Sequence, residues 1–166
     1  MSASLLLRRI RIAVVFIIFG LIVSGVTAFP LEWELKLMAS VFVQNGNYDP
    51  AAYTGLAHWI MKVREGLVVT GESYPFIAYG TDWLAFGHII IALFFLPVFS
   101  NPVRYRGNLK IGLASCILVI PLALICGPVR GIPFYWQLID CSFGIVCFFP
   151  VWLTLRWTQQ LEGMRS

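Results

Sequence analysis

Four long apolar stretches constrain this chain more than any other feature. They are Ile12–Leu31, Trp83–Val103, Ile111–Val129 and Gly131–Leu155, and the only charged residue within them is Asp140. A helix of about 20 apolar residues is long enough to cross the hydrocarbon core of a bilayer, which is roughly 30 Å thick. The sequence therefore predicts an all-α, integral membrane protein with four transmembrane helices.

The predicted spans end where the sequence changes character. Pro30, Asn101-Pro102 and Gly127-Pro128 each follow an apolar stretch, and proline interrupts a helix because it lacks a backbone N–H. We therefore place the transmembrane helices at residues 11–29, 83–99, 110–127 and 134–155. We expect them to form a four-helix bundle, as a single membrane domain over residues 1–166 with an extracytoplasmic helical loop at 30–81.

Composition supports a membrane protein over two other classes. Apolar residues make up 59% of the chain and charged residues 12%, whereas a soluble domain is about half apolar and a quarter charged. The pI near 9.0 would suit a nucleic-acid partner, but the basic residues flank the apolar stretches instead of forming one patch. We therefore expect membrane lipids as partners and no nucleic acid.

Lysine and arginine divide unequally between the two sides of the membrane. If the N-terminus is cytoplasmic, eight of the 12 basic residues lie inside and four outside. An excess of positive charge marks the cytoplasmic side, so we predict that both termini are cytoplasmic in a multi-pass protein of a bacterial inner membrane. As an alternative, the first stretch could be a secretory signal cleaved after Val26-Thr27-Ala28, although it is longer than the usual apolar core of about 7–15 residues.

The loop at 30–81 is predicted to contain two short amphipathic helices. The first covers Leu31–Val43, where alternating residues would also fit a strand, but a lone short strand would have no partner. The second begins with Asp49 as N-cap and Pro50 at the first position, and Gly71 is expected to end it. Residues 73–79 are predicted to return to the membrane as an extended segment.

Two ionisable side chains are predicted at similar depth in the outer half of the membrane. Asp140 lies roughly 9 Å into the fourth helix, at 1.5 Å per residue. His88 follows Asp82 at the same six-residue distance in the second helix, which starts from the same side. Ionisable groups inside a bilayer are costly and are often functional. The matching depth suggests that the two side chains could meet.

Each of these residues also has a structural interpretation. Asp140 could form an ion pair with Arg130, just before its helix, or it could bind a ligand or a proton. His88 could hydrogen-bond a neighbouring helix, relay protons or ligate a cofactor. Asp82 could be an N-terminal helix acid that follows a Thr81 cap.

These residues define a candidate polar cluster. It contains Asp82, His88, Arg130, Gln137 and Asp140, with Ser24 and Thr27 nearby and an aromatic rim of Tyr79, Tyr135 and Trp136. Arg130 would suit an anionic head group, and the aromatic rings would suit a lipid or quinone. Small residues at four-residue spacing predict close helix contacts at Gly20, Ser24 and Ala28 and at Gly112 and Cys116. On the fourth helix, a small and polar face at three- and four-residue spacing is expected to pack inward, and it contains Gln137, Asp140, Gly144 and Cys147.

Other chemical signals in the sequence are weak. All four cysteines lie within the spans and none forms the Cys-x-x-Cys pair of four-helix membrane disulfide oxidoreductases, so we interpret them as packing residues. His58 and His88 belong to no metal-binding motif, so no metal site is predicted. The sequence identifies no cofactor.

Three functions are compatible with these features. We favour a non-enzymatic accessory module that binds lipids or other membrane protein subunits. A membrane enzyme acting on a lipid, isoprenoid or quinone is the first alternative, with His88 as acid/base, Asp140 as its partner and Arg130 holding an anionic group. An oligomeric transporter or channel formed by self-association is the second, because four helices with one intramembrane acid make a poor pore alone.

Overall fold

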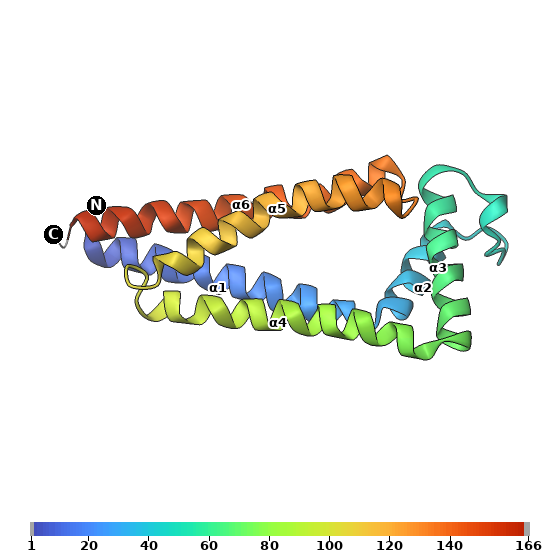
Figure 1. Cartoon of the computed structure of the whole chain (residues 1–166), viewed down its shortest axis with the longest axis horizontal. Helices are drawn as coiled ribbons and strands as arrows, with labels where there is room; N and C mark the ends of the chain where they lie inside the picture. Colours follow the sequence, from blue (N-terminus) through green and yellow to red (C-terminus); the bar gives the residue numbers. More distant parts are fainter. Residues whose placement is uncertain (1, 165–166) are drawn as a thin grey trace. The chain divides into compact units, whose positions relative to one another are not determined.

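A computed structural model describes residues 2–164 and contains helices but no strand within that range (Figure 1). Four helices are long and apolar enough to cross a membrane, with mean hydropathies of 1.9 to 2.4 in their apolar windows. They are α1 (Ala3–Ala28), α4 (Ala78–Ser100), α5 (Arg106–Val129) and α6 (Phe134–Gly163). The all-α class and the four potential membrane helices predicted from the sequence are confirmed.

The long helices extend beyond the predicted spans. α1 begins at Ala3 instead of Arg11, and α6 ends at Gly163 instead of Leu155. Hydropathy marks only the part of a helix that suits hydrocarbon, whereas the backbone hydrogen bonds continue through charged flanks until a cap or turn ends them. The predicted spans are therefore the apolar parts of longer helices.

The first loop helix is α2 (Leu31–Phe42), so the helical interpretation of this segment is correct and the strand alternative is wrong. Leu35 and Ala39 are its buried residues. On its exposed surface, Lys36 forms an ion pair with Glu32 at 2.6 Å, one helical turn away.

The second loop helix starts later than predicted. Asp49 does cap a helix, because its side chain accepts a hydrogen bond from the Ala51 N–H at 2.9 Å, but that helix is the short 3-10 segment η1 (Pro50–Ala52). Extended backbone follows, and the longer helix α3 (Gly55–Ser73) starts at a glycine with φ of +58°. The left-handed conformation at Gly55 separates the two helices.

Two further expectations for this loop are wrong. Gly71 does not end α3, which continues to Ser73, since a glycine inside a helix costs only about 1 kcal/mol relative to alanine. The return to the membrane is helical instead of extended, with 3-10 segment η2 (Pro75–Ile77) leading directly into α4. Pro75 suits this role because its fixed φ favours the first position of a helix.

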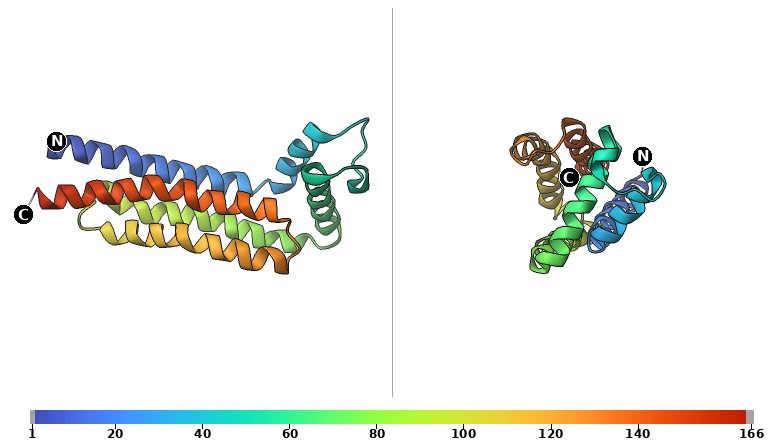
Figure 2. Two further views of the ribbon diagram at one scale, coloured as in Figure 1. Left: turned by 90° about the horizontal axis from the view of Figure 1, so that it is seen from above. Right: turned by 90° about the vertical axis from the view of Figure 1, so that its right-hand side faces the viewer.

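The chain divides into two compact units whose boundaries cross α1 and α4. The terminal unit contains the residues up to Leu21 and those from Ile90 onward, and the loop unit contains Ile22–Ile89. Within the terminal unit, the start of α1, the end of α6 and the α4–α5 connection lie at the same end, as Figures 1 and 2 show. Its apolar core consists of Leu6, Ile10, Val14, Ile17, Phe95, Val98, Leu109, Val151, Leu155 and Leu161.

Helices α5 and α6 form a hairpin in the terminal unit and run side by side (Figure 2). Glycine permits their close approach. A Cβ atom at Gly144 of α6 would lie 2.5 Å from both the Cys116 carbonyl oxygen and the Val119 side chain of α5. At Gly112 a Cβ would lie 2.8 Å from the Phe95 ring. The predicted contacts through Gly112, Cys116 and Gly144 are therefore confirmed.

In the loop unit, α1 and α4 meet at a glycine that the sequence pattern did not identify. A Cβ atom at Gly25 would lie 2.8 Å from the Ala85 carbonyl oxygen and 3.1 Å from the His88 Cβ, whereas one at Gly20 would meet nothing within 4 Å. The predicted contact through Gly20 is wrong. Gly25 instead continues the buried Ile17 and the half-buried Leu21 of α1 at four-residue spacing.

Candidate functional site

The candidate polar cluster is divided between the two units. Asp82 and His88 lie on α4 in the loop unit, together with Tyr79 of the aromatic rim. Arg130, Gln137, Asp140, Tyr135 and Trp136 lie in the terminal unit, at the α5–α6 turn and in the first turns of α6. Each group is described by itself below, and the expected meeting of His88 with Asp140 remains a prediction.

His88 is half-buried and faces α1 at the close approach around Gly25. Its Nδ1 lies 2.9 Å from the Leu84 carbonyl oxygen, which is one turn earlier in the same helix. A carbonyl only accepts, so Nδ1 carries the proton in this arrangement and Nε2 keeps its lone pair in the neutral ring. The hydrogen bond of Nδ1 therefore lies within α4, and a bond from His88 to a neighbouring helix stays a prediction.

Asp82 is not a helix-terminal acid. It is half-buried, and α4 already begins at Ala78, so Asp82 lies beyond the first turn. Thr81 is not an N-cap either, because its hydroxyl donates to the Ala78 carbonyl oxygen at 2.6 Å. The prediction was wrong since it treated Trp83 as the start of the helix, although the backbone becomes helical as soon as η2 ends.

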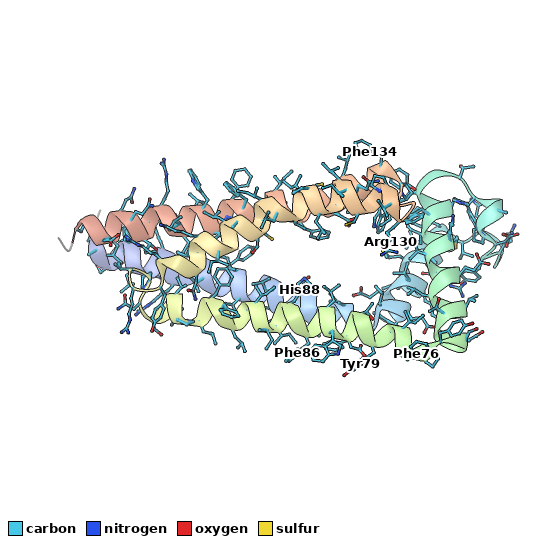
Figure 3. The ribbon with its side chains drawn as sticks, in the orientation of Figure 1. Phe76, Tyr79, Phe86, His88, Arg130 and Phe134 are labelled. Atoms are coloured by element: carbon cyan, nitrogen blue, oxygen red, sulfur yellow. The ribbon has the colours of Figure 1, made fainter. Side chains whose placement is uncertain are left out.

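Tyr79 belongs to a stripe of exposed aromatic rings on α4. Its ring centroid lies 6.0 Å from that of Trp83, whose ring lies 6.1 Å from that of Phe86, and both pairs meet edge to face. Figure 3 shows Tyr79 and Phe86 on one side of α4 and His88 on the other. The aromatic stripe therefore does not surround His88.

Gln137 serves the turn between α5 and α6. Its side chain is 4% exposed, and its Nε2 donates to the Ile132 carbonyl oxygen at 2.8 Å. Its Cγ and Cδ lie 2.6 Å from the position that a Cβ on Gly127 would take. The Gln137 amide thus packs against Gly127, where the missing side chain leaves room for it, and its hydrogen bond closes the turn. The sequence did not predict this structural role.

Asp140 and Arg130 do not form the expected ion pair. Arg130 ends α5, where its backbone N–H donates to the Cys126 carbonyl oxygen at 3.0 Å, and its side chain is exposed. Asp140 is half-buried in α6. Within residues 2–164 the ion pairs are Lys36–Glu32 and Arg106–Glu162. Gly131, with φ of +68°, turns the chain between Arg130 and α6, so proximity in sequence did not bring the two charges together.

The remaining rim residues, Tyr135 and Trp136, lie in the first turn of α6, exposed and half-buried respectively. Among the described residues, no three His, Cys, Asp or Glu side chains gather as a metal site would require. The four cysteines are free, and the buried Cys141 packs with its Sγ 4.0 Å from the Ile120 carbonyl oxygen. Where their contacts are defined, the residues of the candidate polar cluster thus bond within helices and turns.

A second set of charged residues lies at the opposite end of α5 and α6. From the sequence, these residues served only to predict which side of the membrane is cytoplasmic. This basic end of the terminal unit contains Arg8, Arg9, Arg11, Arg104, Arg106, Lys110 and Arg156. Several of these arginines lie over aromatic rings, with Arg11 5.4 Å from the Phe99 centroid and Arg156 4.8 Å from that of Trp152. Arg–aromatic neighbours at a helix end are the signal that could have identified this region.

In comparisons with known proteins, no protein-family model, curated protein or solved structure matches the chain.

Proposed function

We propose that the chain is a non-enzymatic membrane module that binds lipids or another membrane protein. The observation that carries this proposal is that polar side chains of all four long helices form hydrogen bonds within their own helices. His88 bonds within α4, and the hydroxyls of Thr27, Ser115, Ser142, Thr154 and Thr158 all donate to carbonyl oxygens three or four residues earlier in their own helices. Such bonds satisfy each group locally, whereas a catalytic site needs polar atoms that converge on a substrate.

The exposed helix surfaces also support a module of this kind. Helix α5 buries only Leu109 and Gly127, while Ile111 and Ile125 are 68% and 66% exposed. Apolar surface of this extent is unfavourable in water and suits lipid tails or the helices of a partner. We further propose that the four long helices form a bundle, with the short loop helices at the membrane surface.

The proposed topology places both termini in the cytoplasm of a bacterial inner membrane. Two exposed serines allow a conservative test, Ser73→Cys at the end of α3 and Ser100→Cys at the end of α4. In intact cells a membrane-impermeant maleimide should label Ser73→Cys, and it should label Ser100→Cys only after permeabilisation. The parent chain gives the background from its four intramembrane cysteines, and the reverse pattern would overturn the orientation.

The functional proposal is tested by comparing cells with and without the chain. A module predicts that the membrane lipids and quinones have the same composition in both. An enzyme predicts that one lipid or isoprenoid accumulates without the chain and is consumed again by the parent but not by His88→Ala or Asp140→Asn. That second result would overturn the proposal.

A binding readout completes this test. The chain is expressed at its native level, purified into nanodiscs and released from them in a native mass spectrometer. It should then retain a defined lipid or a second protein in fixed stoichiometry. A bare chain that retains neither would contradict the module.

A further inference from the structure

A groove on the terminal unit has the form of a lipid site. It has a volume of about 450 Å³ and is lined by Arg9, Ile12, Ala13 and Phe16 of α1 and by Pro150, Leu153 and Trp157 of α6. The α1 residues are spaced three and four apart, and so are those of α6, so each set occupies one face of its helix. Two helix faces thus form the two walls.

The groove is polar at one end and apolar along the rest of its length. α1 leads away from the basic end and α6 leads back to it (Figure 1). By their order along these helices, Arg9 and Trp157 are the lining residues nearest the basic end, and Phe16 and Pro150 are the farthest from it. From Arg9 to Phe16 the helix rises roughly 10 Å at 1.5 Å per residue. An elongated ligand of this groove must therefore have an apolar body and a polar head group that can lie beside the Arg9 guanidinium.

The charge at the basic end selects the sign of that head group. It holds seven described lysine and arginine residues, and Glu162 is the one acid among its described residues. A surface with this excess of positive charge at a membrane interface attracts anionic lipids. A guanidinium binds phosphate well because it offers several donors in a planar fork.

We propose that the groove binds one anionic phospholipid, with an acyl chain between α1 and α6 and the phosphate at Arg9. This proposal rests on the lipid-binding part of the proposed function and assigns it a place. Ile12 and Phe16 are 60% and 66% exposed, so the acyl chain would cover apolar surface. Ala13 and Pro150 are the smallest side chains of the lining, and a larger residue at either position would fill the space.

The test uses the full chain in nanodiscs of equal parts phosphatidylglycerol and phosphatidylcholine, with retained lipid counted by native mass spectrometry. The parent should retain phosphatidylglycerol in preference to phosphatidylcholine. Arg9→Gln should reduce this preference about fivefold, the effect of one arginine near an anionic surface. Ala13→Trp should abolish the retention of that lipid by filling the groove.

Matched controls separate the groove from general effects. Arg104→Gln removes another exposed cation of the basic end, and Ala114→Trp adds the same volume on an exposed position of α5. Both should retain phosphatidylglycerol as the parent does. Ala13→Leu fills the groove with a smaller side chain. Its lipid retention replaces that of Ala13→Trp as the test if Ala13→Trp lowers the melting temperature.

Three outcomes would overturn the proposal that the groove binds an anionic phospholipid. Equal losses with Arg9→Gln and Arg104→Gln would mean that the charge acts without a site. Unchanged retention in the filling variants would mean that the lipid lies elsewhere. A changed number of subunits with unchanged lipid would assign the groove to a second copy of the chain. None of these results alters the comparison of membrane lipids that tests the module itself, so the two proposals fail separately.

Discussion

The α5–α6 hairpin and the segment 44–64 of the loop unit are held together by opposite means. In the hairpin, Gly144 and Gly112 allow side chains and backbone to approach within van der Waals distance. In the loop, polar groups make the contacts: the Tyr53 hydroxyl accepts from the Gln44 N–H at 3.0 Å and donates to the Asn47 carbonyl, and His58 Nδ1 donates to the Pro50 carbonyl at 2.8 Å.

This difference follows from the two solvents. Lipid tails are as apolar as leucine, so helices in a bilayer gain little from burying apolar surface and gain more from close packing at small residues. A connecting segment outside the hydrocarbon has irregular backbone whose N–H and C=O groups must be satisfied one by one. We therefore expect the hairpin to be sensitive to added volume and the loop to be sensitive to lost hydrogen bonds.

The largest effect is expected from Gly144→Leu in α6. Its Cβ would lie 2.5 Å from the Cys116 carbonyl oxygen, and backbone cannot move aside as a flexible side chain can. We expect a loss of about 3 kcal/mol in the free energy of unfolding, at the upper end of the usual cost of overpacking. Unfolding in mixed micelles with increasing dodecyl sulfate measures it.

Gly20→Leu in α1 is the matched control for this substitution. It adds the same side chain to a membrane helix at a position where a Cβ meets nothing within 4 Å. It should leave stability unchanged or raise it slightly, because leucine is the better helix former. Equal losses in the two variants would show that the hairpin does not depend on close approach.

A smaller effect is expected from Tyr53→Phe in the loop. The substitution removes the hydroxyl that bonds both the Gln44 N–H and the Asn47 carbonyl. Two lost hydrogen bonds of about 1 kcal/mol each, partly replaced by water, should cost about 1 to 2 kcal/mol. Hydrogen exchange of the amides of residues 44–53 should accelerate about tenfold, while those of α5 and α6 keep the parent rates.

Tyr74→Phe removes the hydroxyl of an exposed tyrosine of the loop unit, whose ring packs edge to face with Phe76. This control should exchange as the parent does. If Tyr53→Phe were also neutral, the loop would be held by packing like the hairpin, and the contrast between the two regions would fail.

The sequence predicted the long helices well and their packing contacts only in part. Apolar length alone predicted the four long helices, because the hydrocarbon thickness sets that length. Gly144 was also found, since a small residue among large ones on a membrane helix indicates contact. Gly25 was missed because α1 is apolar on every side, so its buried face has no hydropathy signal to separate it from Gly20.

The polar residues were harder to interpret than the helices. Arg130 and Asp140 suggested an ion pair by their order in the sequence, but the positive φ of Gly131 determines the path between them. Gln137 was assigned to a site because a polar residue in a span is unusual, whereas its amide bonds to Ile132 in a turn. Pairing and capping depend on backbone geometry over a few residues, which residue types alone do not specify.

A cation–π contact extends the polar character of the loop. The Arg64 guanidinium carbon lies 4.2 Å from the centroid of the Tyr48 ring, which joins α3 to the segment before η1. A double-mutant cycle with Arg64→Gln and Tyr48→Leu should give a coupling free energy of about 0.5 to 1 kcal/mol. Zero coupling, measured by thermal unfolding in detergent, would remove this contact from the forces that hold the loop.

The smallest effect is expected from an exposed ion pair of the terminal unit, between Arg106 and Glu162. Its side chains are 46% and 40% exposed, so water and salt screen the attraction. A cycle with Arg106→Gln and Glu162→Gln should give a coupling near 0.5 kcal/mol that declines in 0.5 M salt, comparable to that of Lys36 with Glu32 in the loop unit. A coupling above about 1.5 kcal/mol that resists salt would mean that a polar contact also holds the α5–α6 hairpin. The contrast between packing in one region and hydrogen bonding in the other would then apply only to the membrane-embedded part of the hairpin.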